Sequence, residues 1–443
     1  MLFRSIVLFI AVAMLFFTAW FGFPNFRHLP LSFRIVSGGM AKPGDPGEMT
    51  QFQALSTALS GTVGLGNIAG VALAIQTGGP GAAFWIFVIG WFAMSLKMAE
   101  VTLGLKYREV HPTENHVLGG PMYSMKNGLA ARGWPRLGKW MGFLYAFLAL
   151  FGAITLAQVN QSYVMVSQVT GISAPWTYGV IMALLVGAVV IAGAHWLGRV
   201  ASALVPSMAV LYLIGLACIL TIHADRIPGA ISTILAHAFG LKAMGGGALG
   251  AFIIGMQRVV YSTEAGVGSA VMAHTQARTR EPVSEGLVAL IEPFIDTVVI
   301  CSLGALTLVV ADTWHDGVAI QITSAAFAQV SAWFPILLAV AAFLFAYSTL
   351  VSWGFYGLQA WYYMFSDSKG SEIIYKIAFV SLLPMGAALT AETVYKLIDS
   401  TLFLMAVPNV ILLYIFAGEL RRDVRDYLAR IRSEEHTSEL QSH

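Results

Sequence analysis

Charged side chains are scarce in this sequence. Only 11% of its 443 residues are charged, whereas 57% are hydrophobic and the mean hydropathy is +0.74. A soluble globular domain carries about 25% charged residues, so the composition excludes that class. Cysteine is also rare: Cys218 and Cys301 both lie in apolar runs and carry no information on the redox compartment.

Enzyme signatures are missing as well. The sequence contains no HExxH, no GxSxG and no phosphate-binding GxxxxGK[ST] motif. We therefore expect a protein that is not an enzyme and that needs no cofactor. Neither a nucleic-acid partner nor an obligatory protein partner is evident.

Long apolar segments recur along the whole chain, separated by short polar pieces. This pattern is typical of an all-α polytopic membrane protein, for which the lipid bilayer is the solvent. The first segment has no small-residue cleavage site at its end, so we expect a retained span rather than a signal peptide. Eleven spans are predicted, at approximately residues 3–23, 51–76, 82–107, 137–168, 175–195, 200–224, 247–274, 283–311, 334–365, 372–391 and 400–418.

Basic residues are distributed unevenly between alternate loops. One set of loops contains most of the lysines and arginines, including the basic tail 419–431, and the other set contains few. By the positive-inside rule the N-terminus is outside and the C-terminus is cytoplasmic, in a bacterial inner membrane. The final residues 432–443, RSEEHTSELQSH, match a translated sequencing adaptor, and we expect them to be an artefact.

Glycines interrupt two of the predicted spans at matching places. In both 60–67 and 262–269, a serine is followed by glycines four and six residues later and by a polar residue at seven. The two segments lie five spans apart, so they run in opposite directions. This arrangement predicts an inverted-repeat transporter with its binding site at the breaks. The predicted units are an extra helix and cytoplasmic linker (1–50), a first five-helix repeat (51–226) and a second (247–418).

The glycines have a physical use at such a place. Each costs about 1 kcal/mol in a helix relative to alanine, so a cluster weakens the helix locally. A break at membrane depth exposes N–H groups that bind a carboxylate and carbonyls that bind a cation. Close helix packing is the alternative, and Gly66 and Gly70 form a GxxxG pair. The doubled pattern, with Asn67 and Ser269 as polar partners, favours a binding site.

Several stretches resemble the alanine or glycine:cation symporter family. They are ALSTALSGTVGLGNIAGVALAIQTGGPGAAFW at 54–85, KMAE at 97–100, GGPMY at 119–123, and GVGS at 266–269 after Ser262. The resemblance implies the five-plus-five inverted-repeat fold of amino-acid and neurotransmitter sodium symporters, with broken first and sixth core helices. It also implies import of alanine or glycine driven by sodium, or occasionally by protons.

The resemblance also implies roles for individual residues. Residues 64–67 match the broken first core helix that cradles the substrate carboxylate and amine, and Gln158 would reach the amine. The implied substrate-binding set is Gly64, Leu65, Gly66, Asn67, Gln158, Asn160, Tyr261, Ser262, Gly266 and Trp353. By similarity to the wider fold, sodium would be held by the carbonyls of Ser60 and Val63 and the hydroxyls of Ser348 and Thr349, an oxygen-only site suited to a hard cation.

The sixth core helix departs from the family pattern. Thr263, Val259 and Val271 stand where asparagine, glycine and proline are usual. These changes lie beside the substrate region, so they leave the substrate and the ion stoichiometry open without affecting the fold.

Other polar groups fall inside predicted spans. Lys97 and Glu100 lie three apart on one helical face, where pairing with each other is favoured over a gating role. Arg258 and Glu264 flank the second break, and a structural ion pair and an intracellular gate are equally plausible for them.

Glu292 and Asp296 lie four apart, which fits either a proton-sensitive position or a buried hydrogen-bonded pair. His195 is expected to be interfacial.

Other classes of membrane protein fit less well. A channel filter is usually built by symmetric subunits around one axis, whereas two unlike breaks occur here within one chain. A receptor would need a cytoplasmic output domain, for which the tail is too short. The sequence therefore predicts a sodium-coupled importer of a small neutral amino acid that works by alternating access. A transporter of another small solute, or a proton-coupled one, is the alternative.

Overall fold

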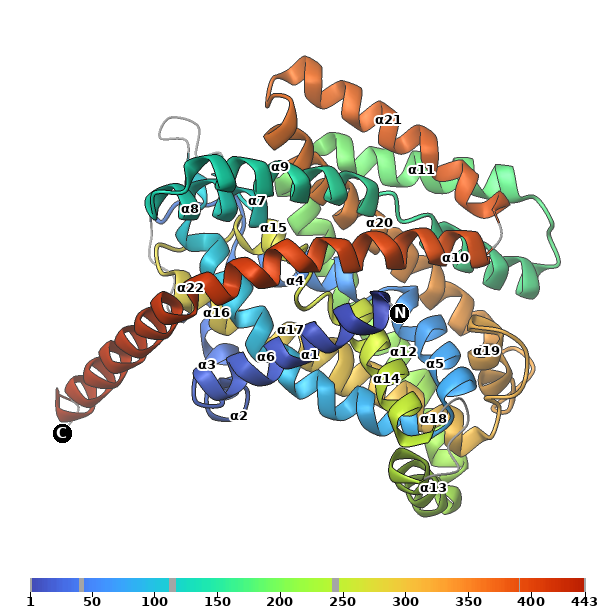
Figure 1. Ribbon diagram of the computed structural model, residues 1–443. Coiled ribbons are helices and arrows are strands. Elements are labelled where there is room, and N and C mark those ends of the chain that lie inside the picture. The colour runs from blue at the N-terminus through green and yellow to red at the C-terminus, as the bar shows by residue number, and fades with distance from the viewer. Residues whose placement is uncertain (1, 40–43, 111–116, 241–246, 390, 442–443) are drawn as a thin grey trace.

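The computed structural model describes residues 2–39, 44–110, 117–240, 247–389 and 391–441, and it is almost entirely helical (Figure 1). Each of the eleven predicted spans contains a helix or a broken helix. The helices of the first half are α1 (Leu2–Trp20), α2 (Pro24–Arg27), α3 (Leu29–Arg34), η1 (Ile35–Gly39), α4 (Gln51–Thr62), η2 (Gly66–Gly70), α5 (Val71–Gly78), α6 (Gly81–Lys106), α7 (Pro121–Tyr123), η3 (Ser124–Gly128), α8 (Leu129–Ala131), α9 (Pro135–Gly152), α10 (Leu156–Thr170), α11 (Pro175–Ala192), α12 (Ala194–Ile222), η4 (Ala224–Arg226) and α13 (Ile227–Phe239).

The second half has the same character. Its helices are α14 (Gly247–Thr263), α15 (Val271–His274), α16 (Pro282–Val288), α17 (Ile291–Pro293), η5 (Phe294–Cys301), α18 (Ser302–Ala311), α19 (Ile320–Ala328), α20 (Phe334–Met364), α21 (Lys369–Ala388) and α22 (Ala391–Gln441). A two-residue hairpin, β1 (Glu109–Val110) paired antiparallel with β2 (Val117–Leu118), follows α6.

Among the described residues, eight helices are long and apolar enough to cross a bilayer. The count becomes nine when α4 and the segment Gly66–Gly78, which meet at a bend of 52°, are taken as one span. The remaining predicted spans correspond to α1, whose apolar part is Ser5–Trp20, and to the pair α14 and α15, which a break separates.

Local signals set the start of the first broken helix. The Thr50 hydroxyl accepts a hydrogen bond from the Gln53 backbone N–H at 3.1 Å, and the Gln53 side chain accepts one from the Thr50 N–H at 3.0 Å. This capping box satisfies two backbone donors that would otherwise lack partners. The cap therefore defines where the helix leading to the first glycine cluster begins.

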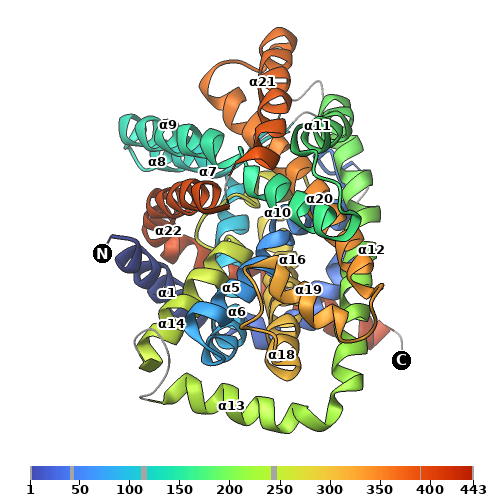
Figure 2. The same cartoon turned by 90° about the vertical axis from the view of Figure 1, so that its right-hand side faces the viewer.

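The broken helices lie inside a shell of unbroken ones. α5 and α6 lie toward the middle of the molecule, α14 lies beside α1, and α9, α11, α12 and α21 lie around them (Figure 2). The long helix α20 packs against α4, α9, α10 and α12, which places its centre beside the first break. α1 packs against α6, α14 and α22, and α13 runs across the lower end of the bundle in Figure 2.

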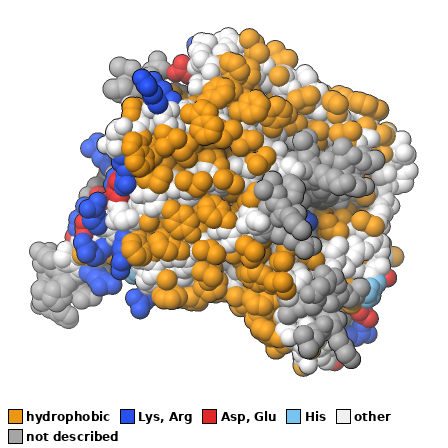
Figure 3. Space-filling view, in the orientation of Figure 1, with side chains coloured by type: hydrophobic (Ala, Val, Ile, Leu, Met, Phe, Trp, Pro, Cys, Tyr) orange, Lys and Arg blue, Asp and Glu red, His pale blue; other side chains and the backbone are white. Residues whose placement is uncertain are grey.

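The outer surface is apolar over a broad band. Many large hydrophobic side chains on α9, α11, α12 and α21 are exposed, as lipid-facing positions require. On the face in Figure 3, hydrophobic side chains cover the middle, and lysines and arginines gather along the left edge, on the side to which α22 extends. A band of this kind is what a helix bundle surrounded by lipid presents.

Candidate functional site

The first break separates α4 from η2. Val63 has a ψ of 82°, which ends the helix, and the chain resumes as a π-helical turn at Gly66. The Gly64 N–H donates to the Thr62 carbonyl at 2.9 Å, and the Asn67 N–H donates to the Gly64 carbonyl at 3.1 Å. Three residues of turn thus replace the regular helix at the predicted place.

The third predicted core helix meets this break directly. The side-chain oxygen of Gln158, on α10, accepts a hydrogen bond from the Leu65 backbone N–H at 3.0 Å. A methyl group added at Gly64 would lie 2.7 Å from Thr349 Oγ1 and 2.9 Å from Gln158 Nε2. Glycine is therefore needed at 64 because α10 and α20 both approach its backbone.

Tyr261 covers the next glycine. A Cβ atom at Gly66 would lie 2.4 Å from Tyr261 Cε1, so the ring of this α14 residue rests on the backbone of η2. At Gly70, one turn later, the nearest atoms to an added Cβ lie 3.8 Å away, on Arg258. Within η2 the close approach thus occurs at Gly66 and not at Gly70.

The second break follows α14 and uses the left-handed region of backbone space. Glu264 has a φ of 52°, Gly266 of 91° and Gly268 of 84°. The Gly266 carbonyl accepts a hydrogen bond from Asn409 Nδ2 at 2.9 Å, and the Val267 carbonyl accepts one from the Tyr145 hydroxyl at 2.8 Å. Carbonyls freed by the break are thus partly satisfied by side chains from other helices.

Trp353 and Glu264 connect α20 to this second break. The indole Nε1 of Trp353 donates to Glu264 Oε1 at 3.2 Å, and the Ser269 hydroxyl donates to Glu264 Oε2. Trp353 is 2% exposed and Glu264 is 3% exposed. Trp353 therefore reaches the second break, beside the region where its role was predicted.

Of the four predicted sodium ligands, Ser60 lies on α4, Val63 directly follows it, and Ser348 and Thr349 lie on α20. The Ser60 hydroxyl donates to the Ser348 carbonyl at 2.8 Å, and the Ser348 hydroxyl donates to the Phe345 carbonyl at 3.1 Å. Within the described part of the chain, Thr349 Oγ1 has no hydrogen-bond partner although the residue is only 1% exposed. A buried hydroxyl oxygen beside the turn at Val63 fits the oxygen-only donor set that a hard cation prefers.

Asn160 is not brought to the breaks. Its side-chain amide donates to the Gly386 carbonyl at 3.2 Å and to the Leu389 carbonyl at 2.6 Å, so it joins α10 to the end of α21. The Ser262 hydroxyl lies 3.0 Å from that of Thr297 in η5, which in turn donates to Asp296.

Asp296 belongs beside the site, which its spacing from Glu292 did not indicate. The Asn67 side-chain amide donates to Asp296 Oδ1, and the Thr297 hydroxyl donates to Asp296 Oδ2 at 2.7 Å. Asp296 is fully buried. The only signal in the sequence was an acidic residue within an apolar span, because a partner 229 residues away cannot be read from spacing.

The remaining charged groups are partnered differently from the expected pairs. Lys97 Nζ lies 3.1 Å from Glu292 Oε1, while Glu100 Oε1 accepts from Asn409 Nδ2 at 2.7 Å. The Arg258 guanidinium lies 5.8 Å from the centre of the Tyr261 ring, and no ion pair joins it to Glu264 in the described structure.

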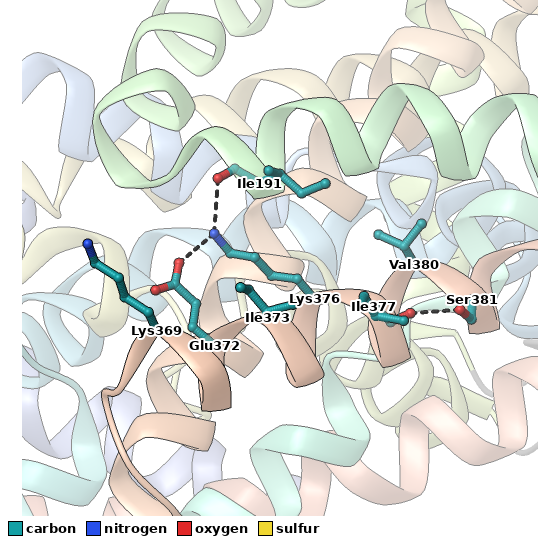
Figure 4. Close-up of a pocket in the computed structure, with 8 residues that line it drawn as sticks. All are labelled: Ile191, Lys369, Glu372, Ile373, Lys376, Ile377, Val380 and Ser381. Carbon is teal, nitrogen blue, oxygen red and sulfur yellow. Dashed lines mark hydrogen bonds and ion pairs between the residues drawn. The ribbon is translucent and has the colours of Figure 1, made fainter.

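A groove of about 580 Å³ lies away from the two breaks, between α11 and α21 (Figure 4). Lys376 crosses it, donating to the Ile191 carbonyl at 3.1 Å and pairing with Glu372 at 2.5 Å. Isoleucines 373 and 377 line it with exposed side chains. Its walls are lipid-facing helices, so it is not part of the site.

The fold matches that of solved transporters. The crystal structure of MhsT in complex with L-phenylalanine superposes with a TM-score of 0.58 at 16% identity, over 84% of this chain and 90% of that chain. Two broken helices that meet among unbroken ones thus define the fold class, the inverted-repeat fold found in membrane transporters.

Sequence comparison identifies the family within this class. The sodium:alanine symporter family model matches residues 1–441. The sodium/alanine symporter AgcS of Methanococcus maripaludis is 35% identical over 413 residues, covering 91% of this chain and 90% of the relative. The amino-acid carrier protein AlsT of Bacillus subtilis is 32% identical over 424 residues, covering 93% and 87%. The chain belongs to the sodium:alanine symporter family: it is a multi-pass membrane transporter that couples amino-acid movement to a cation, and not an enzyme.

Proposed function

We propose that this protein imports a small neutral amino acid, alanine or glycine, together with sodium by alternating access. The observation that carries the proposal is the contact at the first break, where the Leu65 N–H is held by the Gln158 side chain at 3.0 Å. A backbone donor paired only with a movable side-chain oxygen can exchange it for a substrate carboxylate. The printed name of the AgcS relative, a sodium/alanine symporter, supports the same substrate and ion.

In this proposal the substrate carboxylate docks on the amides of residues 65–67. Its amine contacts Gln158 and the carbonyls of the second break, and Tyr261 and Trp353 limit the space left for a side chain. A pocket bounded by two aromatic rings accepts a methyl group or a hydrogen more readily than a branched side chain. Asn160 contributes indirectly, by orienting α10 against α21.

Sodium binds between α4 and α20 in this scheme. The carbonyls of Ser60 and Val63 and the hydroxyl of Thr349 supply oxygens, and Ser348 joins after its hydroxyl rotates away from the Phe345 carbonyl. Binding there stabilises the outward-open state and orders the first broken helix, and the amino acid then docks. Occupancy of both sites then permits the change of access.

The repeat boundaries and the orientation belong to the same proposal. Residues 51–226 and 247–418 form the two inverted repeats, with residues 1–50 as an added helix and linker. The N-terminus lies outside and the basic tail 419–431 lies in the cytoplasm.

Radiolabelled L-alanine uptake into proteoliposomes tests this function. An inward sodium gradient is compared with a matched potassium control and with a proton gradient, with glycine, D-alanine, serine and leucine as competitors. We expect sodium-dependent accumulation that only the small amino acids block. Folded, monodisperse protein that accumulates nothing under either gradient would contradict the proposal and would point to a different substrate, selected by Thr263, Val259 and Val271.

A further inference from the structure

His274 lies fully buried between two carboxylates. Its Nδ1 is 2.7 Å from Glu285 Oε1, and its Nε2 is 3.3 Å from Glu292 Oε2. All three side chains have zero exposure. They come from α15, α16 and α17, three short helices that follow the second break.

The geometry defines the protonation of the ring. A neutral imidazole donates from one nitrogen only, whereas an imidazolium donates from both. Each nitrogen of His274 faces a carboxylate oxygen, so with Glu285 and Glu292 both ionised only the imidazolium satisfies both contacts. Lys97 Nζ lies 3.1 Å from the other oxygen of Glu292, and the two cations then balance the two carboxylates.

Other charged groups also face this cluster: Glu264 and Asp296 interact electrostatically with Glu292, and Arg108 interacts with Glu285. On α6, Glu100 lies one turn beyond Lys97 and is bonded to Asn409. The other helices packed against α15 are α4 and α20, and neither contains an acidic, basic or histidine residue. The Arg108 guanidinium reaches the backbone carbonyl of Thr275, next to His274.

His274 also lies where the linker before α4 meets the loop after α15. Met49 and Ala277 form a β-bridge, and the Met49 N–H donates to the Gln276 carbonyl at 3.0 Å. Arg108 joins the two segments, donating to the Ala277 carbonyl at 2.8 Å and to the Pro46 carbonyl at 3.0 Å. Burial lowers the pKa of Arg108 to about 10, so it remains charged at neutral pH.

A side-chain contact extends this closure to the first broken helix. Gln51, at the start of α4, donates from Nε2 to Glu285 Oε2 at 3.0 Å. The carboxylate that binds the His274 ring therefore also holds α4. Charge on the ring and the position of α4 are linked through a single side chain.

We propose that His274 is a proton-binding site that latches α4 closed at the cytoplasmic end of the pathway. The inference rests on the alternating access of the proposed function, and its ligand is a proton. When α4 swings away, Gln51 leaves Glu285 and the ring releases a proton from Nδ1 to cytoplasmic water. When the ring is neutral, one nitrogen lone pair faces a carboxylate and repels it, which weakens the latch.

The sign of the pH dependence follows from linkage. The closed form binds the proton more tightly than the open form, because in this proposal opening at α4 admits water, which screens the attraction of the two carboxylates for the ring. The closed form is therefore fully favoured at low pH and loses that advantage as the pH rises through the titration of the closed form. A high cytoplasmic pH favours the inward-open form.

Spin-label distances test the latch without requiring transport. Labels replace Phe52 on α4, which is 44% exposed, and the exposed Asp367 after α20, with Cys218 and Cys301 changed to alanine. Distance distributions are measured by double electron–electron resonance on the full chain in nanodiscs, from about pH 6 to about pH 9. We expect a longer-distance population to grow as the pH rises.

Variants separate the proposal from a general effect of pH. His274→Gln keeps a polar side chain without titrating, so its distances should not change with pH. Glu285→Gln removes one carboxylate from the ring, so the midpoint should fall by about one pH unit, a tenfold loss of proton affinity. His195→Gln, at an exposed histidine, should behave as the wild type.

Two results would overturn the latch. One is a distance distribution in the folded wild type that does not change with pH. The other is a pH response in both His274→Gln and Glu285→Gln that is the same as that of the wild type. Either result leaves the alanine uptake experiment unaffected. Loss of uptake with a normal pH response would instead count against the proposed substrate.

Discussion

Gln158 on α10 and Leu65 in the first break are joined by a hydrogen bond of 3.0 Å between the side-chain oxygen and the backbone N–H. Both residues are largely buried, with Gln158 7% exposed and Leu65 1% exposed. A broken helix leaves N–H groups that must find a partner in a medium without water. Gln158 supplies that partner at the position where the proposed substrate would supply its carboxylate.

Replacing Gln158 should therefore impair substrate binding more than folding. Gln158→Ala removes a buried hydrogen-bonding group worth about 1–3 kcal/mol, so the alanine affinity should fall about 5- to 150-fold. Equilibrium binding of radiolabelled alanine to purified protein measures this. Gln168→Ala, at an exposed position on the same helix, is the control and should bind as the wild type. Equal affinities for the two variants would remove Gln158 from the site.

The glycine pair of η2 offers a matched test of the first break. Gly66→Ala places a methyl group 2.4 Å from Tyr261 Cε1 and must displace the ring, so uptake should fall at least about tenfold. Gly70→Ala meets nothing closer than 3.8 Å and should transport normally. Initial rates of uptake, normalised to folded protein, make the comparison. Normal uptake by Gly66→Ala would show that the ring moves aside freely and would remove Tyr261 as a boundary of the pocket.

Substitutions of Thr349 test whether its hydroxyl binds sodium. Thr349→Ala removes the buried hydroxyl that has no protein partner among the described residues, so the half-saturating sodium concentration should rise about tenfold. Thr349→Ser keeps the hydroxyl oxygen, so its half-saturating sodium concentration should be close to that of the wild type. At saturating sodium the alanine affinity should change much less. A variant whose alanine affinity falls while its sodium dependence is normal would contradict the assignment.

The hydrogen bonds of Glu419 predict how low pH changes the stability of the fold at the cytoplasmic end of α22. Burial alone would raise the pKa of Glu419, but hydrogen bonds from Lys106, Tyr107 and Arg132 lower it below its ordinary value of 4.5. A lowered pKa means that the carboxylate stabilises the fold above that ordinary value and loses this effect as the pH falls through its folded pKa.

The thermal stability of the wild type should thus decline between neutral pH and about pH 3 more than that of Glu419→Gln. The difference should stay within about 1 kcal/mol because the group is partly exposed. Melting curves in detergent at several pH values measure it, with Asp426→Asn, an exposed acidic residue on the same helix, as the control. Parallel curves for wild type and Glu419→Gln would contradict this role.

The sequence predicted the helical class, the spans and both breaks because these depend on local composition. Apolar runs and clustered glycines act within one or two turns, and the family resemblance supplied the order of the helices. Asp296 and His274 could not be placed in this way. Each takes its meaning from partners on other helices, such as Asn67 or Glu292, and no spacing rule reports which faces of two packed helices meet.

The same limit explains the charged pairs. Lys97 and Glu100 share a helical face, and spacing alone predicts that they pair. In the fold Lys97 Nζ lies 3.1 Å from Glu292 Oε1, and Asn409 Nδ2 donates a hydrogen bond to Glu100 Oε1 at 2.7 Å. A buried charge selects the partner that best satisfies it, and tertiary packing decides which candidates are within reach.

The position of α1 has a consequence for biosynthesis. The Trp20 indole N–H donates to the Ala417 carbonyl at 2.9 Å, across a separation of 397 residues. At roughly 5–20 residues per second, the ribosome needs about 20–80 s to synthesise that interval. After its own synthesis α1 can therefore pack against α6 and α14 well before α22 is available beside it. The contact between α1 and α22 therefore forms late, after the helices between them in the chain have been synthesised.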